Sequence, residues 1–287
     1  MIGVYDSGFG GLTVLRQLHA SLPERDFVYL GDSGRAPYGG RDSHTLLDFA
    51  EQCVERLFEE GCRLVVVACN TISCVALRHL QHRYAGPGST RRILGVTIPA
   101  VEAAVGMSEG HIGVLGTART VASGTFVEEI RKLGPHRVTQ RAAPLLAPLV
   151  EEGWEATEIA RQAVSRYLEG LEDVDTLVLG CTHYPLLLPV FEGATRARVL
   201  DPSGYVAERL RAWLTRHGEF DVATGAAALK VLCTGDPEVF ERHGQRFFGA
   251  GLPRPGHVAE DGGRLRHRES VSVVVGQVVR SARATGK

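Results

Sequence analysis

The chain has 287 residues, of which 44% are hydrophobic and 23% are charged, and its formal net charge is −1. This composition is typical of a globular protein, and the length suggests about two domains. The near-neutral charge argues against a nucleic-acid partner or an anionic membrane surface, because both usually require a basic patch. No apolar run approaches the roughly 18 residues of a membrane span, and the N-terminus lacks the pattern of a signal peptide, so we expect a cytoplasmic protein.

Short apolar runs alternate with helical patterns along most of the chain. The predicted strands are residues 2–5, 27–30, 64–68, 93–96, 112–115, 176–180, 198–200 and 229–233. Such alternation predicts an α/β fold with parallel sheets and helices on both sheet faces. In these folds ligands bind beyond the carboxyl ends of the strands, so functional residues are sought there.

The first predicted strand runs into Asp6-Ser-Gly-Phe-Gly-Gly11, which opens a helix. Gly8 and Gly10 are typical of a dinucleotide-binding turn, but Thr13 replaces the third glycine of that fingerprint. The free N–H groups of the helix N-terminus suit a small carboxylate better than a cofactor. A tight strand-to-helix turn without a ligand is the structural alternative.

A polar loop containing Asp32, Arg35, Pro37, Tyr38 and Gly39 follows the second strand. Turn chemistry explains the proline and the glycine, but not the crowding of the three polar side chains. One interpretation is an ion pair between Arg35 and Asp32 that fixes the loop.

The clearest helix is predicted from Thr45 to Glu60, with Gly61 after its end. Its apolar residues fall on one face and its acidic residues on the other. Cys53 lies on the apolar face, so we interpret it as a packed core thiol.

Two pairs of segments indicate that the chain consists of two related halves. Ile2-Gly-Val and Ile112-Gly-Val are 110 residues apart, and the strand-end cysteines Cys69 and Cys181 are 112 residues apart. A single buried cysteine is usually a small hydrophobe, but two at matching positions favour a shared function. Halves that face each other would place the thiols on opposite sides of one cleft, a geometry suited to moving a proton between the two faces of a carbon. His183 either shares a proton with Cys181 or is a structural histidine.

We predict two pseudo-symmetric domains with the active site between them. The first comprises residues 1–97 and 205–287, and the second comprises residues 98–204. Residues from about 249 onward stay unassigned within the first domain. Prolines and a Gly-Gly pair suggest a loop, and residues 264–268 are a charge cluster that we expect to be solvated. Four valines from 271 to 279 fit a helical face, although valine is a weak helix former.

Six cysteines could form three disulfides, but a reducing cytosol and a chain of this length argue against that. A structural zinc site is equally unfavoured, because Cys181 and His183 have no second pair at ligand spacing. We therefore predict no metal.

Four motifs together resemble the glutamate racemases. They are D-S-G-x-G-G-L at 6–12, G-D-x-x-R-x-P-Y-G at 31–39, A-C-N-T at 68–71 and G-C-T-H-Y-P-L at 180–186. The resemblance covers residues 2 to about 248. It implies an enzyme that interconverts L- and D-glutamate without a cofactor and supplies D-glutamate for peptidoglycan, and it leaves a homodimer open.

The resemblance also implies roles for individual residues. Cys69 would be the base acting on D-glutamate, assisted by Asp6. Cys181 would be the base acting on L-glutamate, assisted by His183 and Glu151. The implied substrate-binding residues are Ser7, the backbone of Pro37, Tyr38 and Gly39, and the side chains of Asn70, Thr71, Thr117, Thr120 and Thr182.

Three other interpretations fit the paired cysteines. A racemase for aspartate or a hydantoin would share the two thiols. A redox protein would join them in a disulfide. A binding protein would hold glutamate without exchanging its α-proton.

Overall fold

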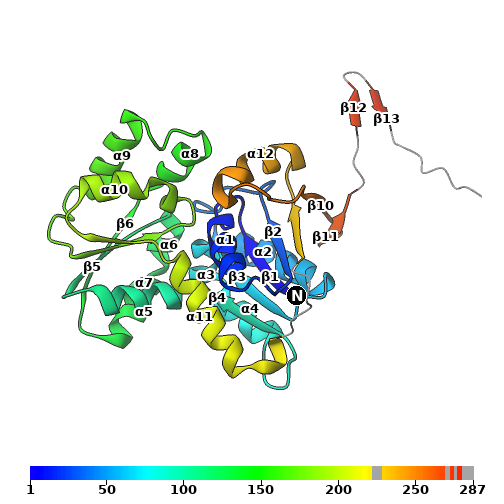
Figure 1. The fold of residues 1–287 in the computed structure, drawn as a ribbon, viewed down its shortest axis with the longest axis horizontal. Coiled ribbons are helices and arrows are strands. Elements are labelled where there is room, and N and C mark those ends of the chain that lie inside the picture. Colours follow the sequence, from blue (N-terminus) through cyan, green and yellow to red (C-terminus); the bar gives the residue numbers. More distant parts are fainter. Residues whose placement is uncertain (222–227, 269–271, 275–276, 280–287) are drawn as a thin grey trace, which may run out of the picture.

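The computed structural model describes residues 1–221, 228–268, 272–274 and 277–279 and contains two main β-sheets side by side, each surrounded by helices (Figure 1). We call the part built on the seven-stranded sheet the first lobe and the part built on the four-stranded sheet the second lobe. This architecture confirms the predicted α/β class with two parallel-sheet units. The predicted domain boundaries, after residues 97 and 204, stay predictions.

The first lobe is built on strands in the order β11-β10-β9-β2-β1-β3-β4. All neighbours pair in parallel except β10 and β11, which are antiparallel. The strands are β1 (Ile2–Asp6), β2 (Phe27–Gly31), β3 (Leu64–Val67), β4 (Arg92–Gly95), β9 (Leu229–Cys233), β10 (Gly256–Asp261) and β11 (Arg264–His267).

The second lobe repeats part of this arrangement. Its strand order, β6-β5-β7-β8, matches β2-β1-β3-β4 of the first lobe. The strands are β5 (His111–Gly116), β6 (Arg137–Ala142), β7 (Thr176–Gly180) and β8 (Arg198–Leu200). The sequence prediction missed β6. The offset of 110 residues that relates Ile2 to Ile112 also carries the start of β2 to position 137, so the repeat contained the signal for this strand.

The helices lie between successive strands. They are α1 (Leu12–Ser21), α2 (Ser43–Glu59), α3 (Asn70–Val75), α4 (Leu77–Tyr84), α5 (Thr97–Met107), α6 (Ala118–Ser123), α7 (Thr125–Leu133), α8 (Leu146–Glu151), α9 (Glu158–Leu168), α10 (Leu188–Ala194), α11 (Ser203–Arg216) and α12 (Pro237–Phe248), with the 3-10 turns η1 (Tyr184–Leu187) and η2 (Gly218–Phe220). Within the described ranges, no helix is long and apolar enough to cross a membrane.

Helix α2 illustrates how local sequence fixes an element. Asp42 caps its N-terminus by accepting a hydrogen bond from Thr45 N at 3.0 Å. Gly61 follows its end with a φ of 87°, a conformation that glycine adopts without strain. Cys53 is fully buried, as predicted, on the face that packs against the first sheet.

Alternate residues of the central strands point into different core layers. Val4 packs on the side of α1, α11 and α12, while Tyr5 packs on the side of α2. In the second lobe, Leu115 packs on the side of α9 and α10, while Val114 packs on the side of α5 and α7. Each sheet is therefore covered on both faces, which leaves the carboxyl ends of the strands as the place where the lobes can form a site.

The sequence gives no assignment after about residue 249, where the prolines and the Gly262-Gly263 pair suggest a loop; in the structure residues 256–261 and 264–267 are strands, and the glycine pair lies in the turn between them. Strands β10 and β11 form a hairpin at the edge of the first sheet, and within β11 Leu265 is buried while the arginines are exposed. Beyond it, β12 (Ser272–Val274) pairs with β13 (Gln277–Val279), so Val278 and Val279 belong to a strand. Val271 and Val275 lie outside the described residues.

Candidate active site

Cys69 and Cys181 occupy equivalent positions at the ends of central strands. Cys69 lies between β3 and α3, and Cys181 directly follows β7. β3 pairs with β1 in the first sheet, and β7 pairs with β5 in the second. The two residues are 4% and 7% exposed, so each thiol is held in a mostly buried position at the edge of its sheet.

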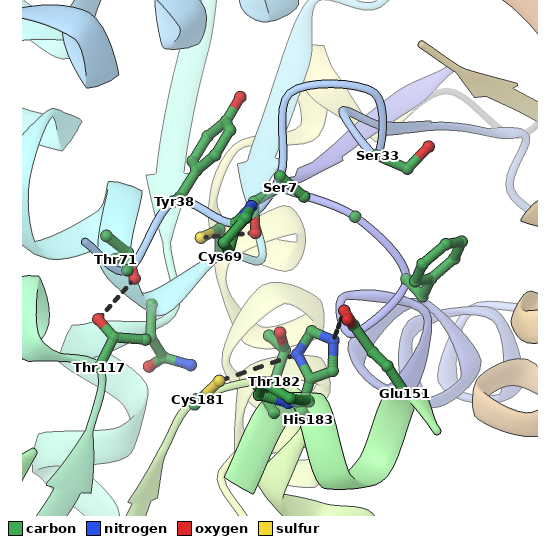
Figure 2. A pocket seen from close by; sticks show the side chains of 18 residues that line it. Ser7, Ser33, Tyr38, Cys69, Thr71, Thr117, Glu151, Cys181, Thr182 and His183 are labelled. Atoms are coloured by element: carbon green, nitrogen blue, oxygen red, sulfur yellow. Dashed lines mark hydrogen bonds and ion pairs between the residues drawn. The ribbon is translucent and has the colours of Figure 1, made fainter. Parts of the chain in front are cut away.

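A cavity of about 420 Å³ lies between the lobes, and both cysteines line it. Figure 2 shows them on opposite sides of this space. Twelve of the fourteen predicted site residues line the cavity: Ser7, Pro37, Tyr38, Gly39, Cys69, Asn70, Thr71, Thr117, Glu151, Cys181, Thr182 and His183. The other two, Asp6 and Thr120, do not line it and are fully buried.

On the Cys69 side, the thiol donates a hydrogen bond to Ser7 Oγ at 3.5 Å. The carboxylate of Asp6 accepts hydrogen bonds from Gly8 N at 3.0 Å and, across the lobes, from Thr182 Oγ1 at 3.4 Å. Burial, reinforced by the charge of Asp6, raises the pKa of Cys69 to about 12. Burial also raises the pKa of Asp6, while the charge of His183 opposes that rise. At neutral pH, Cys69 in the free protein therefore keeps its proton and is suited to act as an acid.

On the Cys181 side, His183 connects the thiol to a carboxylate. Its Nδ1 lies 3.8 Å from Cys181 Sγ, and its Nε2 lies 2.9 Å from Glu151 Oε1 (Figure 2). Burial on its own would lower the pKa of His183, but the contacts with Cys181 and Glu151 raise it to about 10. Although burial opposes the change, the hydrogen bond with His183 lowers the pKa of Glu151. A charged imidazole thus stands between the carboxylate and the sulfur at neutral pH.

Three threonine hydroxyls meet where the lobes touch. Thr71 Oγ1 lies 3.0 Å from Thr117 Oγ1, which lies 3.0 Å from Thr120 Oγ1. Thr117 also caps α6 by accepting a hydrogen bond from Thr120 N at 3.1 Å. Thr120 therefore supports Thr117 from behind the cavity wall. The Oδ1 atom of the neighbouring Asn70 is buried without a hydrogen-bond partner among the described residues.

The loop that carries Pro37, Tyr38 and Gly39 is anchored by a buried carboxylate, Asp32. Its oxygens accept hydrogen bonds from the Tyr38 hydroxyl, from Arg35 Nε at 2.8 Å and from Thr234 Oγ1 at 2.6 Å. The Ala36–Pro37 peptide is cis. The ion pair between Arg35 and Asp32 confirms the interpretation that this pair fixes the loop, and it explains why the three polar residues crowd together.

The cavity is also lined by six residues that were not predicted as site residues: Gly8, Phe9, Ser33, Ala36, Ala147 and Pro148. Four of them lie inside motifs that were recognised, so motif membership would have found Gly8, Phe9, Ser33 and Ala36. Ala147 and Pro148 adjoin Glu151 on α8 but have side chains without reactive groups. Phe9 stacks on the ring of His243 at a centroid distance of 5.1 Å, and the ring of Phe240 lies tilted against it at 5.0 Å.

No lysine lines the cavity in the described part of the chain, so a Schiff base has no attachment point there. All six cysteines are unpaired. Among the described residues, no group of three or more histidine, cysteine, aspartate or glutamate side chains is arranged to hold a metal ion. The reactive groups of the cavity are therefore the two thiols and the acids, histidine and hydroxyls beside them.

Comparisons with known proteins agree with this chemistry. The profile of the Asp/Glu/hydantoin racemase family matches residues 11–210. The glutamate racemase of Geobacter metallireducens is 38% identical over 257 residues, which cover 88% of this chain and 93% of that protein. The crystal structure of glutamate racemase from Francisella tularensis in complex with D-glutamate superposes with a TM-score of 0.83 at 28% identity, covering 90% of this chain and 97% of that one. The glutamate racemase isoform RacE1 of Bacillus anthracis superposes with a TM-score of 0.84 at 32% identity, covering 92% and 98%.

Proposed function

Because this chain belongs to the Asp/Glu/hydantoin racemase family, we propose that it interconverts L- and D-glutamate by proton transfer at the α-carbon between Cys69 and Cys181. The observation that carries the proposal is the pair of thiols on opposite sides of one cavity, each with its own polar partners. The substrate is proposed from the relatives that carry the name glutamate racemase. A thiol on each side can serve one enantiomer as base and the other as acid.

For L-glutamate, Cys181 removes the α-proton and Cys69 delivers its own proton to the opposite face. The elevated pKa of Cys69 supports this direction, because that thiol already holds the proton it must donate. For D-glutamate, the roles reverse: Cys69 is the base, assisted by Asp6, and Cys181 is the acid. In both directions the charged imidazole of His183, held by Glu151, stabilises the thiolate form of Cys181: the form that accepts the α-proton of L-glutamate and the form left after Cys181 has given its proton to the other enantiomer.

The carbanion that forms between the two transfers needs fixed hydrogen-bond donors. Asn70, Thr71, Thr117 and Thr182, with the Ser7 hydroxyl, are the proposed donors to the substrate. Donors fixed before reaction can each stabilise a developing anion by ~3–4 kcal/mol in a dry site. The backbone of Pro37, Tyr38 and Gly39 is the proposed partner of the second carboxylate, since the anchored loop borders the same cavity. We propose no cofactor or metal for this reaction.

We further propose that the enzyme acts in the cytoplasm and supplies D-glutamate for peptidoglycan. A homodimer is part of the same proposal, and light scattering of the purified chain tests it by giving the molar mass in solution.

The function is tested by incubating the purified protein with L-glutamate in deuterated water without added cofactor. We expect the optical rotation to fall to zero and the D-glutamate formed to carry deuterium at Cα, because the delivered proton comes from a thiol in exchange with solvent. A parallel incubation with L-aspartate separates the two amino acids. Binding of glutamate without α-proton exchange, or turnover of aspartate alone, would overturn the proposal.

A further inference from the structure

Helix α12 of the first lobe reaches across to α8, the second-lobe helix that carries Glu151 (Figure 1). Its residue Arg246 makes the crossing contacts. Arg246 Nη1 donates to the Glu151 carbonyl oxygen at 3.0 Å, and Nη2 donates to the Val150 carbonyl oxygen at 2.8 Å. Nη2 also lies 2.8 and 2.9 Å from the two carboxylate oxygens of Glu155. One guanidinium thus binds three groups of the opposite lobe, with 31% of its side chain exposed.

These contacts complete the C-terminal end of α8. The last carbonyls of a helix have no partner inside the helix, and a cation is favoured at that end. Arg246 donates to two of these carbonyls with its planar fork, an arrangement that a lysine ammonium cannot reproduce. The Val150 carbonyl also accepts a hydrogen bond from Gly153 N at 3.0 Å. Because α8 ends at Glu151, the contacts fix the backbone from which the Glu151 carboxylate reaches His183.

The residue next to Arg246 supports the other member of this pair. Phe247 is fully buried, and its ring meets the His183 ring edge-on at a centroid distance of 5.3 Å. One turn earlier, His243 stacks on Phe9 in the cavity wall. The end of α12 therefore packs against both groups that serve Cys181, whereas no hydrogen bond or ring contact in the described part of the chain joins α12 to Cys69.

We propose that Arg246 is a positioning residue for the Cys181 half of the reaction. From the first lobe, it holds the end of α8 so that the Glu151 carboxylate stays on His183 and His183 stays beside Cys181. The inference rests on the proposed function. It also means that the set of groups beside Cys181 is complete only while the two lobes are in contact.

The test compares isotope effects in the two directions of the Arg246→Met variant. L- and D-glutamate have equal free energies, so kcat/KM must be equal for both in any variant, and rates alone cannot assign an effect to one thiol. We expect kcat/KM to fall about 10- to 100-fold, in keeping with the effect of a small misplacement of a reacting group. With 2-deutero-L-glutamate the isotope effect on kcat/KM should rise, because removal of that deuteron by Cys181 becomes more rate-limiting. With 2-deutero-D-glutamate it should fall, because Cys69 removes that deuteron in a step that limits the rate less.

Three further variants make the test specific. Arg242→Met removes the same charge from an exposed position of the same helix, where no hydrogen bond or ion pair is found among the described residues, and should leave both isotope effects unchanged. Arg246→Lys keeps the charge without the fork and should restore activity only in part. Glu155→Gln removes one of the three partners, and it gives a milder probe if Arg246→Met does not fold.

The inference would be overturned if the two enantiomers gave equal isotope effects in Arg246→Met. It would also be overturned if both isotope effects kept the values of the unmodified protein in Arg246→Met and in Glu155→Gln. Failure of the proposed function looks different, because the unmodified protein would then not racemise glutamate at all.

Discussion

Cys69 and Cys181 end equivalent strands, but the groups beside them differ. Cys69 lies next to a hydroxyl, Ser7, and burial together with the charge of Asp6 raises the pKa of this thiol to about 12. Cys181 lies next to His183, an imidazole whose pKa is raised to about 10. The repeated fold gives the thiols matching positions, and different side chains stand beside each of them. A repeated scaffold can therefore surround two equivalent thiols with different polar groups by changing only a few side chains.

The two sides of the cavity are also coupled. Thr182 follows Cys181 in the second lobe and donates a hydrogen bond to Asp6 in the first. The positive charge of His183 opposes the rise in the pKa of Asp6 that burial causes. A change of protonation at His183 therefore alters the pKa of Asp6 on the Cys69 side. The effects of a substitution on one side are for this reason best measured by experiments that report on each thiol separately.

Removal of either thiol should have the largest effect. We expect Cys69→Ala and Cys181→Ala each to lower the rate of racemisation about 10²- to 10⁴-fold, since each removes one acid–base group. The remaining thiol should still exchange the α-proton of one enantiomer with solvent: L-glutamate in Cys69→Ala and D-glutamate in Cys181→Ala. Proton NMR in deuterated water follows this exchange for each enantiomer separately.

The matched control for this pair is Cys62→Ala, because Cys62 is also a buried cysteine but does not line the cavity. It should retain normal racemisation. Exchange of both enantiomers in either active-site variant, or undiminished racemisation, would contradict the assignment of one thiol to each face.

Loss of the Asp6 carboxylate should have the next largest effect and should act on the Cys69 side. We expect Asp6→Asn to lower kcat about 10- to 100-fold. It should also speed the alkylation of Cys69 by iodoacetamide, because the charge that helps to raise the pKa of this thiol is gone. Mass spectrometry measures the alkylation of Cys69 against that of Cys62, which serves as an internal reference for local unfolding. The exposed Asp48→Asn is the control, and slower alkylation of Cys69 in Asp6→Asn would contradict the prediction.

The sequence was informative about the central strands for a physical reason. β7, β8 and β9 begin and end at the predicted residues, and the other predicted strands are shifted by no more than one residue at either end. Apart from β4 and β8, these strands are mostly buried, so most of them form continuous apolar runs bounded by polar or small residues. The motifs then fall at strand ends, which is why twelve of the predicted residues share one cavity.

The strands that escaped prediction lie at or next to sheet edges: β6 and β11 are edge strands, and β10 lies between β11 and β9. β6 pairs only with β5 and contains Arg137, Gln140 and Arg141, and β11 contains two arginines and one buried leucine. A strand that is half exposed has too few apolar residues to produce a clear pattern. The contacts of Arg246 escaped for another reason: they depend on how the lobes pack, and nothing in the local sequence of α12 records that packing.

The pair of His183 and Glu151 should make the stability of the protein depend on pH in a way that the Cys69 side does not. The pKa of His183 is raised above its ordinary value of 6.5 to about 10, so its contribution is complete below about pH 6.5 and is lost as the pH rises through 10. The pKa of Glu151 is lowered from 4.5, so its contribution is present above that pH and lost in acid. We expect Glu151→Gln to lower the free energy of unfolding by about 1 to 3 kcal/mol between pH 4.5 and 6.5.

Urea unfolding of Glu151→Gln and the unmodified protein at pH 5.5, 8 and 10 measures this difference directly. It should shrink steadily from the lowest to the highest of these pH values. A difference that does not change with pH would mean that the ion pair does not set the pKa of His183.

The smallest effect is expected at a second arginine that joins the lobes near the cavity. Arg119 of α6 approaches the loop on the Cys69 side: its Nε donates to the Arg41 carbonyl oxygen at 2.8 Å, and its backbone N donates to the Gly39 carbonyl oxygen at 3.0 Å. Arg119→Met removes only the first of these hydrogen bonds, worth about 0.5–1.5 kcal/mol, and leaves the second. We expect KM to rise by less than about threefold and both isotope effects to stay unchanged, as measured with the deuterated enantiomers used for Arg246→Met. A rise in the isotope effect with 2-deutero-D-glutamate and a fall with 2-deutero-L-glutamate, the reverse of Arg246→Met, would show that the Arg119 contact tunes Cys69, and the asymmetry between the two sides would then extend to both edges of the cavity.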